Sequence, residues 1–286
     1  MEYLKMCCIV PHPPILIPEI GGTEVKKLKK STEAMKELAG QIRQFGPETL
    51  VVISPHSPVH REAFILQEDK QLSGSFSMFR APQVTLQSTT DANLAEALFE
   101  AAGSKGIPVA RGPGSRDAGG GGGNLDHGIL VPLYFLAPQS FSLLCISISL
   151  LSYWDHYRLG TAIREAVEST GHRTVFIGSG DMSHRLIRGA PAGYSPRGEE
   201  FDLSVVRIME SGDYEKLFGL DEGLIDEAGE CGLRSIFAVA GAVDGYAVES
   251  RVLSYEGPFG VGYMVASVIP GEQDPGRELP PPGKEG

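Results

Sequence analysis

The sequence contains few cysteines, and they are not arranged as a disulfide framework. The four among 286 residues are Cys7, Cys8, Cys145 and Cys231, and no CxxC pair occurs. A small secreted fold held by disulfides is therefore not expected, and the cysteines fit a reducing cytoplasm. The N-terminus also lacks a basic region followed by a long apolar one, so we expect no signal peptide and a cytoplasmic location.

Positive charge and long apolar runs are scarce as well. Acidic residues outnumber basic ones by 36 to 25, which gives a net charge of −11. Such a surface repels phosphate groups, so we expect neither a nucleic-acid partner nor a membrane surface. No apolar stretch is long enough to span a bilayer. The dense basic run of Lys26, Lys27, Lys29 and Lys30 lies in a helical pattern with acidic neighbours, which favours a solvated helix face.

The chain opens with a strand–helix–strand pattern. Residues 3–10 and 49–53 are apolar runs that stop near prolines, and residues 23–45 show the apolar spacing of a helix. This βαβ pattern implies two parallel strands. The predicted fold class is α/β, with one three-layer α/β/α domain over residues 1–269 around a mainly parallel or mixed sheet.

The rest of the chain predicts further elements of both kinds. Strands are expected at residues 64–67, 74–78, 83–87, 108–110, 142–150, 174–178, 247–255 and 260–269, and helices at residues 91–103, 156–169, 198–211, 213–220 and 230–243, with a loop over 225–229. Five consecutive glycines, residues 119–123, predict a flexible loop. From residue 270 to 286, proline and glycine predominate without a core-forming pattern, so this tail is expected to be disordered.

Three histidines each follow a predicted buried strand: His12, His56 and His184. The carboxyl ends of parallel strands meet at one edge of a sheet, where ligands bind. Prolines flank both His12 and His56, and they restrict the backbone on either side of each imidazole. Surface histidines in proline turns are the alternative, but two such residues after strands of one βαβ unit favour metal ligation.

A third metal ligand should be anionic. Glu230, at the start of a predicted helix, is the favoured candidate, although it could only complement the helix dipole. Two histidines and one carboxylate are typical of non-haem iron(II) sites with open positions, so Fe(2+) is the expected cofactor. Cys231 is the rival ligand, and its thiolate would favour zinc or copper.

Two further histidines fit acid–base roles, because an imidazole titrates near neutrality. His184 is one, and the neighbouring Asp181 either orients it or caps a turn. His127 is the other: it lies beside Asp126 among glycines, where it can approach a ligand closely. A simple loop histidine is the competing interpretation for His127.

Taken together, these motifs resemble the class III extradiol dioxygenases of the LigB type over residues 3–269. The motifs are Pro11-His12-Pro13-Pro14, Ser54-Pro55-His56, Asp126-His127-Gly128 with Val131-Pro132, and Ser179-Gly180-Asp181-Met182-Ser183-His184. The resemblance implies a single α/β/α domain, with iron(II) held by His12, His56 and a glutamate, here Glu230. It implies His184 as the acid–base residue and His127 in the substrate site, with a small catechol-like aromatic and dioxygen as substrates.

The segment Gly229-Glu230-Cys231-Gly232 also resembles the related Memo family, in which a cysteine before glycine takes the place of the glutamate. That resemblance implies a metal-binding protein without ring cleavage, working with an AMMECR-type domain protein or a radical-SAM protein. A zinc hydrolase using the same histidines is a third hypothesis. Association into a homo-oligomer is compatible with each of them.

Overall fold

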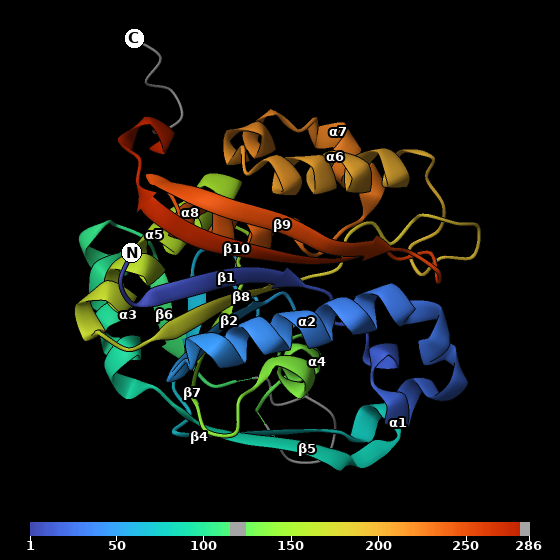
Figure 1. The fold of residues 1–286 in the computed structure, drawn as a ribbon, viewed down its shortest axis with the longest axis horizontal. Helices are drawn as coiled ribbons and strands as arrows, with labels where there is room; N and C mark the ends of the chain where they lie inside the picture. The colour runs from blue at the N-terminus through green and yellow to red at the C-terminus, as the bar shows by residue number, and fades with distance from the viewer. Residues whose placement is uncertain (115–123, 281–286) are drawn as a thin grey trace.

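Ten strands form one mixed sheet in the computed structural model, which describes residues 1–114 and 124–280 (Figure 1). The strands are β1 (Leu4–Val10), β2 (Thr49–Ser54), β3 (Phe64–Gln67), β4 (Gln71–Phe76), β5 (Ala81–Thr90), β6 (Val109–Gly112), β7 (Ser142–Ser147), β8 (Thr174–Ser179), β9 (Tyr246–Glu256) and β10 (Tyr263–Gln273). Their order is β4-β5-β7-β2-β8-β1-β10-β9, and β3 pairs with β6 and β7 outside this path.

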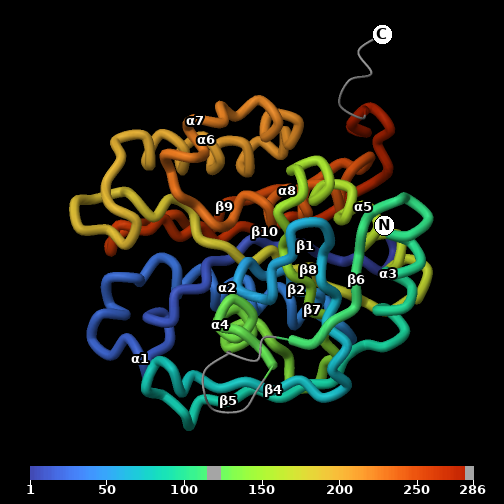
Figure 2. Tube along the Cα trace, turned by 180° about the vertical axis from the view of Figure 1, so that it is seen from behind, coloured from blue at the N-terminus to red at the C-terminus, as the bar shows by residue number. Residues whose placement is uncertain are grey.

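The centre of the sheet is parallel. Strands β7, β2, β8 and β1 run in the same direction, and Val52 of β2 lies between Cys145 and Ile177. Strand β10 is antiparallel to β1, and β9 is antiparallel to β10. In Figure 2 the four parallel strands lie centrally, between α6 and α7 on one side and β4 and β5 on the other. Their carboxyl ends therefore share one edge of the sheet.

Both faces of the central strands are buried, which explains their nearly continuous apolar runs. Cys7 and Val51 belong to one apolar core, and the neighbouring Cys8 and Val52 to another. On the first face pack α3 (Ala92–Ser104), α5 (Tyr153–Thr170), α6 (Arg197–Ser211), α7 (Glu222–Ala228) and α8 (Leu233–Ala242), and on the second pack α2 (Lys29–Phe45) and α4 (His127–Leu136). The α/β prediction with a mixed sheet is thereby confirmed.

Several predicted helix limits differ from the structure. The helix expected from residue 23 begins at Lys29, after 3-10 turns over Gly22–Leu28, and α1 (Pro18–Gly21) precedes them. Helix α5 begins at Tyr153, because Ser152 and Asp155 form a capping box. The helix expected over residues 213–220 is a 3-10 segment, Tyr214–Gly219.

The largest difference lies near residue 230. The loop expected over residues 225–229 is largely the helix α7, which Asp221 caps through the Leu224 amide and which ends at Gly229 with φ 59°. Helix α8 begins at Leu233 and not at residue 230. Residues 230–232 therefore form a short link between two helices, and this link reaches the carboxyl edge of the sheet.

Regular structure continues past residue 269, where the tail was expected to begin. Strand β10 extends to Gln273, and the Leu279 amide donates to the Asp244 carboxylate at 3.0 Å. Residues 270–273 thus pair with β9, and Leu279 is held by the turn that follows α8. Residues 281–286 and the glycine run 119–123 lie outside the described residues.

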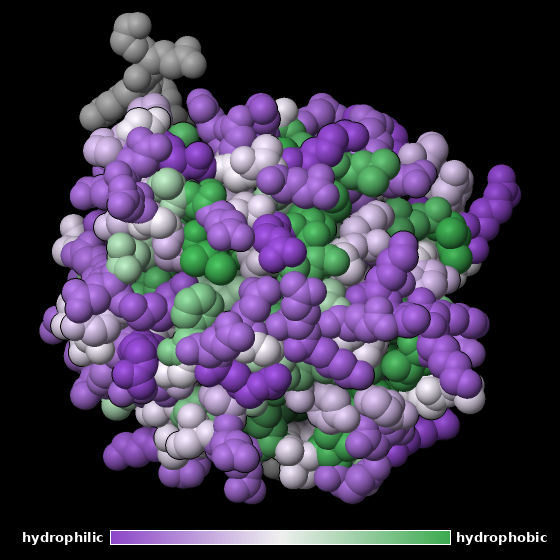
Figure 3. Space-filling view, in the orientation of Figure 1, coloured by the Kyte–Doolittle hydropathy of each residue, from purple (hydrophilic) through white to green (hydrophobic). Residues whose placement is uncertain are grey.

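The surface agrees with the interpretation of the lysine run. Lys26, Lys27, Lys29 and Lys30 are exposed, and Lys27 pairs with Glu24 at 2.6 Å. Hydrophilic groups predominate on the face that Figure 3 shows, with apolar groups scattered among them. No helix in residues 1–114 and 124–280 is both long and apolar enough to cross a membrane.

Gly160→Ala should lower the free energy of unfolding, because α5 and α8 touch backbone to backbone at this position. A Cβ on Gly160 would lie 1.9 Å from the Ala238 carbonyl oxygen and 2.6 Å from the Ala242 nitrogen. Overpacking of this kind costs about 1–3 kcal/mol, measured by urea denaturation. Gly103→Ala is the matched control, since a Cβ on that helical glycine meets nothing within 4 Å. Equal stabilities of the two variants would contradict this account of the helix contact.

Candidate metal centre

Two histidines and one cysteine meet at the carboxyl edge of the parallel strands. His12 follows β1, His56 follows β2, and Cys231 lies in the link before α8. The Nε2 atoms of His12 and His56 are 3.0 Å apart, and Cys231 Sγ lies 3.7 Å from His12 Nε2. Their three ligand atoms lie within 4.8 Å of one another, which brings two imidazoles and a thiol to one point.

His12 is the best-anchored of the three. It is 2% exposed, its backbone amide donates to Asp181 Oδ1 at 2.9 Å, and its Nδ1 lies 2.9 Å from the Ser179 hydroxyl. His56 is more open to solvent, and its own amide donates to the Ser54 hydroxyl at 3.1 Å. Buried hydrogen bonds thus hold the cluster in place at His12, whereas solvent reaches the cluster beside His56.

The two imidazoles are held in their neutral form. Burial lowers the pKa of His12 well below its usual value, and the neighbouring histidines lower it further. Desolvation of the ring lowers the pKa of His56, against an opposing effect of Asp126. A neutral imidazole carries a lone pair on one nitrogen, which is the form that binds a metal.

Cys231 is held by the backbone of Asp181. The Cys231 amide donates to the Asp181 carbonyl at 3.2 Å, and the Asp181 amide donates to Sγ at 3.3 Å. Burial raises the pKa of the Cys231 thiol, and it raises the pKa of the Asp181 carboxyl to about 7. The sequence suggested that Asp181 orients His184 or caps a turn, whereas its side chain holds His12 and its backbone holds Cys231.

Glu230, the expected third ligand, does not join the two histidines. Its carboxylate accepts the Leu233 amide at 2.6 Å, and burial raises its pKa to about 7. Because α8 begins at Leu233, this carboxylate satisfies a free N–H in the first turn of the helix. The helix-dipole alternative therefore describes Glu230, and the neighbouring Cys231 takes the place beside His12.

His127 stacks close to the metal-ligand candidates. Its ring centroid lies 4.0 Å from that of His56, and burial lowers its pKa to about 4. The preceding Asp126 is buried and accepts the hydroxyls of Ser54 and Ser57 at 2.8 and 2.6 Å. A Cβ on Gly128 would lie 2.4 Å from the Ser54 hydroxyl, so only glycine permits this close approach of α4.

His184 lies on the segment that leaves β8. Its Nδ1 is buried without a partner, one of four such side-chain atoms in the part of the chain that the structure describes. Burial lowers the pKa of His184, and a positive charge on His184 would lower the pKa of His12. Asp202 holds the preceding residue by accepting the Ser183 amide at 2.7 Å. His184 thus keeps one buried ring nitrogen without a hydrogen-bond partner.

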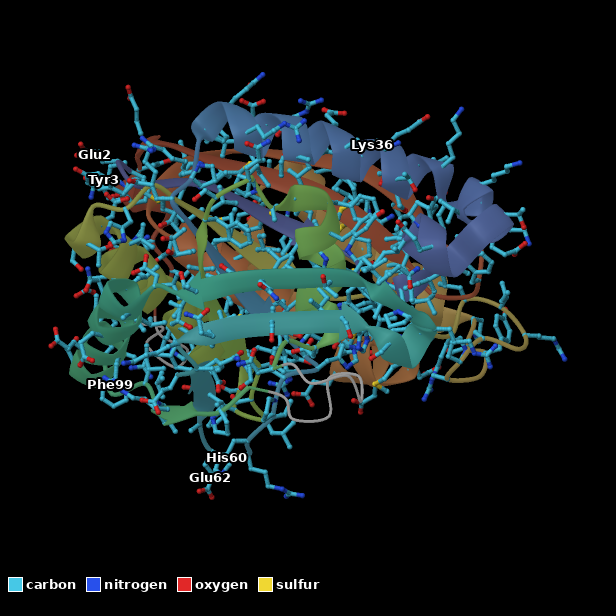
Figure 4. All side chains as sticks on the ribbon, turned by 90° about the horizontal axis from the view of Figure 1, so that it is seen from below. Glu2, Tyr3, Lys36, His60, Glu62 and Phe99 are labelled. Atoms are coloured by element: carbon cyan, nitrogen blue, oxygen red, sulfur yellow. The ribbon has the colours of Figure 1, made fainter. Side chains whose placement is uncertain are left out.

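The remaining histidines are structural or exposed. His156 lies between the Ser152 carbonyl and the Ser149 amide, within α5 and not at its start. His172 pairs with the buried Asp91 at 2.8 Å, whereas His60 projects from the periphery (Figure 4). Ser54 and Ser179, which end β2 and β8, each open one of the quoted histidine motifs, but the sequence alone assigned them no role.

The depressed pKa of His127 predicts a pH dependence of stability. In the unfolded chain an imidazole binds a proton below about 6.5, whereas His127 in the folded protein stays neutral down to about 4. The unfolded state binds more protons in this window, so stability falls as the pH drops from 6.5 to 4. His127→Gln should lose less stability over that window, measured by chemical denaturation of metal-free protein.

His60→Gln is the control for this experiment, because it removes an exposed imidazole. Its stability curve should run parallel to that of the parent. Parallel curves for the parent and His127→Gln between pH 6.5 and 4 would show that His127 is not held neutral by its surroundings.

Comparison with known proteins identifies the family of the chain. Residues 6–266 match a family model described as the catalytic LigB subunit of aromatic ring-opening dioxygenase. The protein CA_C1420 of Clostridium acetobutylicum is 36% identical over 260 residues, which are 90% of this chain and 56% of that protein. The chain thus spans just over half the length of this relative.

Two more distant proteins cover most of the chain. The 2-aminophenol 1,6-dioxygenase beta subunit of a Pseudomonas species is 25% identical over 252 residues, with 77% of this chain and 78% of that subunit covered. The crystal structure of uncharacterized protein JW3007 from Escherichia coli K12 superposes with a TM-score of 0.63 at 16% identity, covering 93% and 99% of the two chains. With its fold, its histidine cluster and a family match over residues 6–266, the chain belongs to the LigB family.

Proposed function

We propose that the protein is a metal-dependent oxidoreductase of the dioxygenase type, acting on a small catechol-like aromatic with dioxygen. The observation that carries this proposal is the approach of His12 Nε2, His56 Nε2 and Cys231 Sγ at the carboxyl edge of the sheet. LigB family membership and the similarity to a 2-aminophenol dioxygenase subunit support the choice of substrate class.

The donor set fits a divalent transition metal. Two neutral imidazoles and one thiol, which would lose its proton on binding, give three ligands and leave further positions open. Imidazole suits iron, zinc and copper alike, whereas a thiolate shifts the preference toward zinc and copper. Iron(II) is the metal that the dioxygenase function requires, and His12, His56 and Cys231 would hold it.

The protein's own residues would orient the substrate and move its proton. When bound, iron(II) would supply the redox chemistry between the aromatic diol and dioxygen. His184, with its unpartnered Nδ1, would accept a proton from a substrate hydroxyl and later return it. His127, whose ring centroid lies 5.6 Å from that of Phe79, would line the substrate site beside His56.

A second function is favoured by one observation, the thiol of Cys231 in the place of a carboxylate. A metal-binding protein without ring cleavage would hold zinc or copper at the same three residues. It would act with other proteins, an AMMECR-type domain protein or a radical-SAM protein. The chain's relative CA_C1420 extends well beyond the matched region, which leaves room for a further domain in that protein.

Metal content distinguishes a site in which Cys231 is the third ligand from one in which Glu230 is. Elemental analysis of protein purified without oxygen, and then reconstituted with iron(II), should show near-stoichiometric metal in the parent. His12→Ala, His56→Ala and Cys231→Ala should lose it, because each removes one ligand. Glu230→Gln is the matched control next to Cys231, and it should retain the metal. Loss in Glu230→Gln with retention in Cys231→Ala would reverse the assignment of the third ligand.

The identity of the metal and oxygen uptake distinguish the two functions. Bound iron together with oxygen consumption on catechol or 2-aminophenol supports the dioxygenase. Bound zinc or copper without oxygen consumption supports the metal-binding partner protein. A parent protein that binds none of these metals would remove both proposals.

His184→Gln should abolish most turnover while leaving the metal in place. Loss of a general acid–base group typically costs about 10²–10⁴-fold in rate. Oxygen consumption and metal content are measured on the same preparation. An unchanged rate would exclude His184 as the proton acceptor, and loss of the metal would instead make it a structural support of the site.

A further inference from the structure

A proline within α4 leaves one backbone carbonyl without its helical partner. Helix α4 contains Pro132, four residues after Gly128. Proline has no amide hydrogen, and its ring crowds the carbonyl of the residue four positions earlier. The Gly128 carbonyl therefore cannot make the usual bond to residue 132, and it is available to a donor outside the helix.

The Ser179 hydroxyl is that donor. At the end of β8 it donates to the Gly128 carbonyl oxygen, 51 residues away along the chain, and Ser179 is fully buried. A hydroxyl has a single proton, so Ser179 Oγ acts as acceptor toward its other neighbour. That neighbour is His12 Nδ1 at 2.9 Å.

From these contacts we infer that Ser179 is a positioning residue, which fixes His12 as the tautomer protonated at Nδ1. A neutral imidazole carries one proton, so Nε2 of His12 is left with a free lone pair. This atom is the one that faces His56 Nε2 and Cys231 Sγ. Hydrogen bonds of this kind, made by the other ring nitrogen, set the orientation and tautomer of metal-binding histidines.

The reverse tautomer would break one of the two contacts of the Ser179 hydroxyl. With the proton on Nε2, His12 Nδ1 would need the Ser179 hydroxyl as a donor, which would take that proton away from the Gly128 carbonyl. The same logic extends to His56. Because His12 Nε2 has no proton in the metal-free protein, the 3.0 Å contact requires His56 to donate from its own Nε2. The two histidines therefore have opposite tautomers before metal binds.

This inference rests on the proposed function only in taking His12 Nε2 to be a metal ligand. The tautomer itself is a property of the metal-free protein, and it is read from the ¹⁵N chemical shifts of the imidazole nitrogens in long-range ¹H–¹⁵N spectra. His12→Gln and His56→Gln assign the two sets of signals. The test variant is Ser179→Ala, which removes the hydroxyl and keeps a small buried side chain.

Ser235→Ala is the matched control. Ser235 is equally buried and donates its hydroxyl to a carbonyl at the same strand end, that of Ser179, at 2.8 Å. It therefore reproduces the loss of one buried hydroxyl-to-carbonyl bond. We expect the parent and Ser235→Ala to show His12 protonated at Nδ1 and His56 at Nε2. In Ser179→Ala, His12 should shift to a mixture or to the Nε2 form.

Zinc(II), used as a redox-inactive probe, gives the second measurement. Its dissociation constant should rise about 10–100-fold in Ser179→Ala relative to both the parent and Ser235→Ala. A parent His12 protonated at Nε2 overturns the inference, and so does a Ser179→Ala variant with parental tautomer and parental zinc affinity. A fixed Nδ1–H tautomer in a parent that binds neither zinc nor iron(II) nor copper upholds the inference and overturns the metal function instead.

Discussion

The parallel pairing of β1, β8 and β2 is the constraint on which the site depends. The carboxyl ends of these strands lie at the same edge of the sheet. His12 therefore contacts His56, which is 44 positions away along the chain, and Ser179, which is 167 positions away. The pairing survives because both faces of these strands are covered by apolar side chains of the two helical layers. Burial also fixes the register, and with it the histidine cluster, because a slip by one residue would exchange the side chains that face the two cores.

Most of the buried polar groups around the histidines have hydrogen-bond partners. Asp181 holds the His12 amide, Asp126 holds two serine hydroxyls, and Asp202 holds the Ser183 amide. Buried polar groups are stable only when such partners exist. Among the described residues, the ring nitrogen Nδ1 of His184 is one of four buried side-chain atoms that have no such partner.

Close backbone approach makes this packing feasible. Gly128 lets α4 lie against Ser54 and His56, and a Cβ on Gly180 would lie 2.2 Å from the Gly232 Cα. The second contact brings the link before α8 down onto the end of β8, which places Cys231 beside His12. Ordinary side chains at these glycines would push the cluster apart, so the site depends on small residues as much as on its ligands.

The strand–helix–strand opening, the α/β class and the location of His12, His56 and His184 after strands could be predicted from the amino-acid sequence alone. These features follow from local patterns, namely apolar runs, helical spacing and prolines that stop a strand. The choice between Glu230 and Cys231 was not local. Two adjacent residues point in different directions, and which one faces the histidines depends on where α8 begins.

The start of α8 at Leu233 is visible only in the folded protein, since packing of the link against β8 competes with helix propensity there. The role of Ser179 likewise required a carbonyl from α4, which no local pattern connects to β8. The sequence thus specified which residues arrive at the edge of the sheet. Long-range packing determined which of their atoms face one another, because side-chain direction is set by contacts between segments distant along the chain.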